Sequence, residues 1–147
     1  MTADLIARLE AAESGSRELD VAIAQAIAKP TTFLNYMTFD EAVRDFPHDL
    51  VNIANNWPIP HFSASIDASV ALIGEKLPGW FFGLQENRWS KEPEQTERRW
   101  SAYLSPPTYD PEEPEIEVTH RDRYLSCCIA LLRALSTQPV SGEVADG

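Results

Sequence analysis

The order of the regular segments is the feature that most constrains what this chain can fold into. Helical spacing runs from Leu5 to Ala28 and again from Tyr124 to Leu135, and an aromatic, strand-like stretch from Trp80 to Leu104 lies between them. This order predicts a mixed α/β (α+β) domain, because a sheet with an apolar face needs helices to cover it. We expect a three-layer helix/sheet/helix sandwich with a small, mostly antiparallel sheet.

The N-terminal helical segment contains a break. Gly and Ser at positions 14–16 favour a stop and a restart over one straight helix, and the Ser16 hydroxyl is placed to cap the amide of Leu19. After the break, Leu19, Ile23 and Ile27 recur at spacings of four, as on one face of an amphipathic helix. The sequence therefore predicts two consecutive helices before Pro30, which disfavours helical geometry in the residue before it.

The segment from about 30 to 62 is interpreted as an insertion that packs onto the core, because it is rich in aromatic residues. Its clearest helical pattern places Phe39, Val43 and Phe46 on one face, with Thr38 as the N-cap. We expect residues 1–137 to form a single sandwich domain that includes this insertion. Residues 138–147 are polar and contain Gly and Pro, so we expect a flexible tail.

The aromatic stretch predicts a β-hairpin. Trp80–Leu84 is too aromatic for a loop, and in Arg99–Leu104 apolar and polar residues alternate as on the two faces of a strand. The polar residues 90–97 between them are typical of a longer hairpin loop. The predicted core joins the inward side chains of this hairpin to the apolar stripe of the last helix, and consists of Trp80, Phe82, Trp100, Leu104, Leu125, Cys128 and Leu132.

A short segment in which apolar and polar residues alternate precedes the last helix. Ile116–Val118 is compatible with a short edge strand, and Thr119 is expected to cap the helix, with Asp122 as the acid of a capping box. His120 then lies at the helix start, where we expect it to be solvated.

Charge and cysteine content limit the functional class. The net charge of −11 opposes phosphate backbones and anionic lipid, which disfavours direct nucleic-acid binding and membrane binding. The sequence opens without a basic or apolar leader and has no apolar run approaching ~18 residues. Cys127 and Cys128 are neighbours on a helix and cannot form an ordinary disulfide with each other. We expect a protein of the host cell cytoplasm.

Three blocks of the sequence resemble a known family. They are Leu5–Asp20, the stretch Ser63–Ala68 leading to Leu77–Trp80, and Cys128–Ala134. In this order they are similar to the phage ABA-sandwich family of small phage and prophage proteins. The resemblance implies a helix/sheet/helix fold and a phage-derived origin, and it implies no catalytic residues. The stretch 31–60 is longer and more aromatic than the strand pair expected there, so no binding surface is carried over from it.

The sequence contains no catalytic or cofactor motif. His48, His61 and His120 do not stand at metal-ligand spacings, and the six glycines are dispersed rather than gathered in a phosphate loop. At least Cys128 lies on the apolar helix stripe, which favours an inert core thiol. We therefore expect no enzyme activity, no cofactor and no metal.

Basic and aromatic residues gather around the predicted hairpin. They are Trp89, Arg98, Arg99, Trp100 and Tyr103. Guanidinium groups suit phosphates and aromatic faces suit bases, so these residues are candidates for contact with a nucleotide. The alternative is that the glutamates at 86, 94 and 97 neutralise the arginines on a solvated hairpin.

A run of acids follows in and after the proline-rich stretch, from Asp110 to Glu117, and it consists of Asp110, Glu112, Glu113, Glu115 and Glu117. Such a run can imitate a phosphate track and block a nucleic-acid-binding protein. The alternative is a solvated spacer, which is the usual role of charge runs in such loops.

These observations predict a non-enzymatic phage or prophage accessory protein that binds and inhibits a host protein, such as a basic or nucleic-acid-binding component of host defence. The alternative is an oligomeric sponge that sequesters a nucleotide-derived defence signal. The chain has four Trp residues, which are favoured anchors of interfaces. We therefore expect a homo-oligomer, most simply a dimer, with Trp89, Trp100 or Trp57 near the interface.

Overall fold

The computed structural model describes residues 2–28, 38–57, 59–87, 99–107 and 115–137. The elements in chain order are α1 (Thr2–Ala11), α2 (Arg17–Ile23), the short π-helix η1 (Ala24–Ala28), α3 (Phe39–Asp45), α4 (Leu50–Asn56), α5 (Ile66–Lys76), β1 (Phe81–Asn87), β2 (Arg99–Ser105), β3 (Ile116–His120) and α6 (Arg123–Thr137). None of the described helices is both long enough and apolar enough to cross a membrane.

The strands form one antiparallel sheet in the order β1-β2-β3. The mixed α+β class and the small antiparallel sheet are therefore confirmed. In β2 the predicted apolar face is found, because Ala102 and Leu104 are buried on the helix side, but Ser101 on the opposite face is also buried, at 1% exposed. β3 is an edge strand as expected, but it extends past Val118 to His120.

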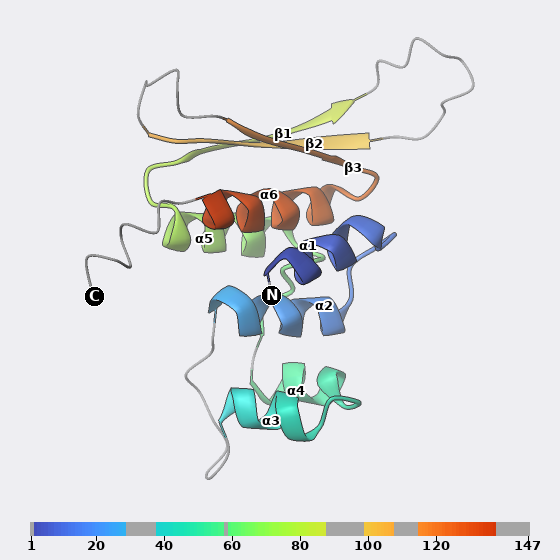
Figure 1. The fold of residues 1–147 in the computed structure, drawn as a ribbon. Helices are drawn as coiled ribbons and strands as arrows, with labels where there is room; N and C mark the ends of the chain where they lie inside the picture. Colours follow the sequence, from blue (N-terminus) through green and yellow to red (C-terminus); the bar gives the residue numbers. More distant parts are fainter. Residues whose placement is uncertain (1, 29–37, 58, 88–98, 108–114, 138–147) are drawn as a thin grey trace.

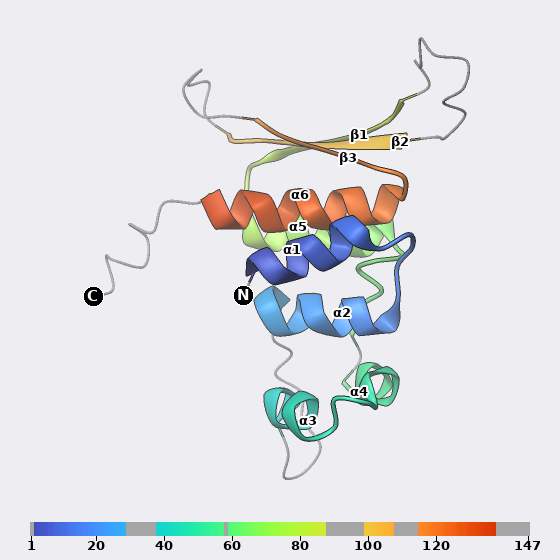
Figure 2. The same ribbon diagram turned by 45° about the vertical axis from the view of Figure 1, so that its right-hand side comes forward.

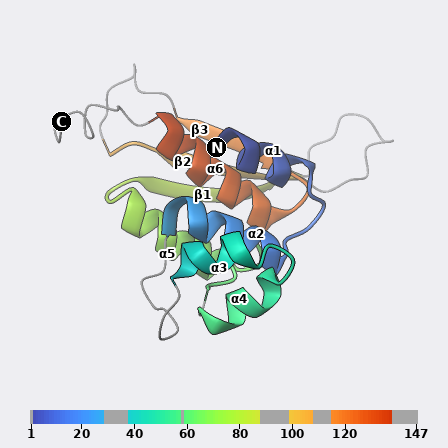
Figure 3. The same ribbon diagram turned by 60° about the horizontal axis from the view of Figure 1, so that its bottom comes forward.

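The layers follow one another on one side of the sheet (Figures 1 and 2). α6 packs against β2 and β3, with α5 beside it, and α1 packs on α6. α2 lies beyond them, and α3 with α4 is farthest from the strands; Figure 3 shows this pair in front and the strands behind. Within the described residues, the opposite face of the sheet carries no helix.

Most of the predicted core is found in the interior. Leu104, Leu125 and Leu132 are fully buried, and Cys128 is nearly so. Trp80 and Phe82 pack against this cluster while partly exposed. Trp100 is on the inward face but stays partly exposed at the end of the sheet.

Trp57 corrects one expectation. Its side chain is 2% exposed and its ring meets Phe39 edge-on, with 6.2 Å between the ring centroids. The expectation that Trp57 offers exposed aromatic surface is therefore wrong, because the residue is part of the core of the chain itself. The inserted segment folds back and buries its own aromatic residue.

Hydrogen bonds from an ion pair within α2, Arg17 with the buried Asp20, join this helix to the insertion and to Ser63. Asp20 is 1% exposed; it accepts a 2.8 Å hydrogen bond from Arg17 and bonds from both the amide and the hydroxyl of Ser63. Arg17 in turn donates to the carbonyl oxygens of Ala54 and Ile59. Helix α4 and this junction were not predicted from the sequence.

Serine or threonine side chains cap the starts of three helices, and two of these caps were predicted. Ser16 accepts from the amide of Leu19, as predicted, and Thr38 accepts from the amide of Glu41. Ser65 accepts from the amide of Ala68 at the start of α5. Short polar side chains before an apolar repeat are therefore a reliable signal of a helix start here.

The start of α6 differs from the prediction. Thr119 is a strand residue and bonds the Ser101 hydroxyl at 2.9 Å, so it does not cap the helix. Asp122 takes that role itself, accepting from the amides of Tyr124 and Leu125. His120 is 8% exposed rather than solvated.

Candidate ligand-binding site

One end of the sheet brings three polar or aromatic side chains into a row. The register aligns Glu86 with Trp100 and Trp100 with His120. All three belong to the face that carries Leu104 and Val118, since residues two apart in a strand share a face. The row therefore lies on the helix side of the sheet, next to the first turn of α6.

A backbone hydrogen bond orients the His120 ring and selects its neutral tautomer. Nδ1 accepts a 2.8 Å hydrogen bond from the backbone amide of Asp122. A neutral imidazole that accepts at one nitrogen carries its proton on the other. His120 therefore presents Nε2–H, a donor, and has no second lone pair to offer.

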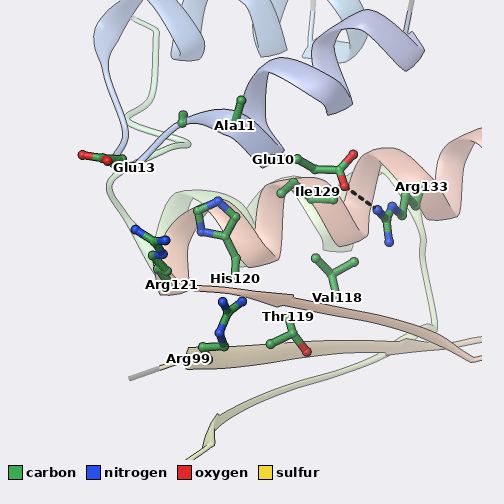
Figure 4. A pocket seen from close by; sticks show the side chains of 11 residues that line it. Glu10, Ala11, Glu13, Arg99, Val118, Thr119, His120, Arg121, Ile129 and Arg133 are labelled. Carbon is green, nitrogen blue, oxygen red and sulfur yellow. Dashed lines mark hydrogen bonds and ion pairs between the residues drawn. The ribbon is translucent and has the colours of Figure 1, made fainter. Parts of the chain in front are cut away.

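His120 lines a pocket of about 360 Å³ between β3, α6 and the end of α1. The lining residues are Glu10, Ala11, Ala12, Glu13, Arg99, Val118, Thr119, His120, Arg121, Ile129 and Arg133. Figure 4 shows Glu10 and Arg133 joined at one end, and His120, Arg121 and Arg99 gathered at the other. The lining of the pocket thus includes three arginine and two glutamate side chains.

The ion pair at the far end of the pocket connects two helices. Arg133 of α6 donates to Glu10 of α1 at 3.0 Å, and the two side chains are 40% and 48% exposed. A pair this exposed contributes little to stability. Arg133 is therefore able to exchange this partner for a ligand at low cost.

A second hollow, of about 460 Å³, lies where the start of α5 meets β1, β2 and the start of α6. It is lined by Ala64, Ser65, Ile66, Asp67, Leu84, Trp100, Arg123 and Tyr124. The guanidinium carbon of Arg123 lies 5.4 Å from the centroid of the Trp100 ring and 4.8 Å from that of Tyr124, within the range of cation–π contact.

Arg123 is held in this position as a cation. Its guanidinium donates to the Tyr124 hydroxyl oxygen at 2.8 Å. That hydrogen bond, followed by the negative charges of Asp122 and Glu86, raises the pKa of Arg123 above its usual value. The side chain therefore adds a permanent positive charge to the hollow.

The two thiols are unsuited to nucleophilic chemistry. Burial raises the pKa of Cys127 and of Cys128 to about 12. The Cys128 thiol donates to the carbonyl oxygen of Phe62 at 3.1 Å. Thiols with such a pKa stay protonated at neutral pH, and the thiolate is the reactive form.

The predicted contact residues divide into three groups. Arg99 and Trp100 lie at the end of the sheet and line the pocket and the hollow respectively. Tyr103 is on the opposite face of β2, where its register partners are Gly83 and Glu117, so it is not part of the site. The remaining candidates lie outside the described residues: Trp89, Arg98, Asp110, Glu112 and Glu113.

The sequence reasoning missed His120, Arg121, Arg123, Tyr124 and Arg133 as site residues. A signal existed for one of them: Val118 and His120 are two apart, so a strand extended by two residues would place both on the helix side. Arg133 had no such signal, because α6 and α1 are far apart in the sequence.

Comparison of this chain with protein-family models, with curated proteins and with solved structures finds no match. Within the described ranges, no group of three or more His, Cys, Asp or Glu side chains is placed to hold a metal ion.

Proposed function

We propose that this chain is a non-enzymatic binding protein that captures a small phosphate-bearing ligand in the pocket lined by His120. The observation that carries the proposal is one pocket that has Arg99 and Arg121 beside His120 at one end and Arg133 at the other. Arginine presents a planar fork of donors that matches phosphate oxygens.

The chemistry of the pocket favours an anion over a metal ion. A metal needs a lone pair from histidine, but the Nδ1 lone pair of His120 is used by the Asp122 amide and its Nε2 carries the proton. The arginines offer only donors. A ligand for these groups must therefore supply acceptors and negative charge.

The broader role follows from the resemblance described above. A phage or prophage accessory protein in the host cytoplasm would act by holding an anionic signal away from its receptor. Inhibition of a host protein through the acidic run remains a prediction, since Asp110, Glu112 and Glu113 lie outside the described residues. The homo-oligomer also remains a prediction.

The test is calorimetric titration with pyrophosphate at low salt. Arg133→Gln removes one pocket charge and breaks only an exposed ion pair, so we expect intact folding and a rise in Kd of roughly tenfold, the effect of losing one charge-assisted hydrogen bond. Arg44→Gln is the matched control, because Arg44 is also exposed and paired, with Asp45, on a distant helix.

Two results would contradict the proposal. The first is the absence of pyrophosphate binding to the unaltered protein. The second is an equal loss of pyrophosphate affinity in Arg133→Gln and Arg44→Gln. Such a result would indicate a general effect of net charge rather than a binding site.

A further inference from the structure

The pocket lined by His120 has two polar ends and an apolar middle (Figure 4). Val118 and Ile129, both buried, line the part between the ends. Val118 lies two residues before His120 in β3, which is about 7 Å along the strand. Ile129 lies four residues before Arg133 in α6, which is about 6 Å along the helix. A ligand that reaches both ends therefore crosses a short apolar stretch.

The end beside His120 carries most of the donors. Arg99 and Arg121 lie there, and Glu13 is the acid of the lining on the same side. The Nε2–H group of His120 adds a neutral donor to the two guanidinium forks. We therefore expect this end to take the phosphate of the proposed ligand.

The other end already holds an anionic group. Arg133 of α6 donates to the carboxylate of Glu10 of α1 at 3.0 Å, and the two side chains are 40% and 48% exposed. The carboxylate of Glu10 thus lies where an anionic group of a ligand would meet the Arg133 guanidinium. Because so exposed a pair contributes little to the fold, another anion can replace the carboxylate at small cost.

We propose that the ligand of this pocket has two anionic groups joined by a short apolar segment, and that Glu10 is a built-in competitor of the second group. This rests on the proposed function, since the first group is the phosphate at the His120 end. The second group is a phosphate or a carboxylate, because the planar fork of Arg133 matches the oxygens of both.

The experiment compares trimethylenebisphosphonate with propylphosphonate by calorimetry. The two probes share a carbon chain and differ in the second anionic group. The salt concentration is about 0.15 M, at which exposed charges more than about 8 Å apart are largely screened. The unaltered protein should bind the bisphosphonate at least about tenfold more tightly, the effect of one added charge-assisted hydrogen bond. Arg133→Gln should remove this advantage and leave the affinity for propylphosphonate unchanged.

Glu10→Gln should have an effect of the opposite sign. It removes the carboxylate that competes for Arg133, so the bisphosphonate should bind more tightly, by up to about fivefold, the most that an exposed ion pair is usually worth. The affinity for propylphosphonate should stay the same. Glu75→Gln is the matched control, because Glu75 is an exposed glutamate beside Lys76 on α5, outside the lining of the pocket. It should change the affinity for neither probe.

The outcomes separate this inference from the proposed function. Equal affinities for the two probes, or a change in Glu10→Gln no larger than that in Glu75→Gln, would overturn the ligand with two anionic groups. The anion pocket would still stand if pyrophosphate binds and Arg133→Gln weakens its binding. No binding of pyrophosphate, trimethylenebisphosphonate or propylphosphonate would overturn both.

Discussion

At the scale of single residues, Gly15 is the position with the least room. A side-chain carbon there would overlap the carbonyl oxygen of Ser63, which is held close because the Ser63 hydroxyl accepts from the amide of Ser16. The break between α1 and α2 therefore needs glycine for its close approach to the insertion, and not only for a turn.

We predict that Gly15→Ala lowers the free energy of unfolding by about 1–3 kcal/mol, the usual cost of overpacking. Gly74→Ala is the control, because nothing lies within 4 Å of the added carbon and the residue is inside α5. There the substitution should stabilise the protein by roughly 0.5–1 kcal/mol. Urea unfolding, monitored by tryptophan fluorescence, measures the free energy of unfolding of both variants. Equal changes in the two variants would contradict the close contact between Gly15 and Ser63.

At the scale of elements, α6 is the central helix. It lies between the sheet and α1, with α5 beside it, and every residue from Leu125 to Leu132 is buried. Both thiols are on this helix, and burial raises the pKa of each from 9.0 to about 12. The folded protein therefore keeps these two protons at a pH where the unfolded chain loses them.

This difference predicts a loss of stability in alkali. Below pH 9 the thiols are protonated in both the folded and the unfolded protein, and their contribution to the free energy of unfolding is fully present. Between pH 9 and about 12 this contribution is lost as the pH rises. Each thiol lowers the free energy of unfolding by up to about 1.4 kcal/mol per pH unit in this window. Urea unfolding at pH 8 and pH 10.5 tests it.

The comparison needs a variant without the thiols. In the double variant Cys127→Ala, Cys128→Ala the protein should be less stable at pH 8, because core volume is lost, but its stability should fall less between the two pH values. An identical fall in the variant and the unaltered protein would assign the alkaline loss to other groups.

At the scale of the whole molecule, the hydrogen bonds of Arg17 and the buried Asp20 connect the layers. Arg17 of α2 donates hydrogen bonds to the carbonyl oxygens of Ala54 and Ile59, near the end of the insertion. Asp20 accepts one from the amide of Ser63. The α3–α4 layer is thereby tied to the part of the chain that carries the sheet. We expect the described layers to unfold together.

We predict that Asp20→Ala lowers the free energy of unfolding by about 3–5 kcal/mol, because Arg17 is left without its buried partner. Asp45→Ala breaks an exposed pair with Arg44 and should leave the urea midpoint unchanged. Far-UV circular dichroism and tryptophan fluorescence should give coincident transitions in both. An unaltered midpoint in Asp20→Ala would show that this pair does not connect the layers.

The sequence by itself determined the local structure of this protein. The break at 14–16, the caps at Ser16 and Thr38, and the apolar face of β2 were all readable. The reason is that capping bonds and apolar periodicity act between residues no more than four apart. Of the candidate site, the same reasoning found Arg99 and Trp100.

Only the tertiary structure decided the rest. The layer order depends on Asp20 meeting Ser63, and the pocket depends on Glu10 meeting Arg133. The role of His120 depends on its register with Trp100. These partners are distant in the chain, and their pairing follows from the packing of whole elements. Local residue spacing carries no information about that packing.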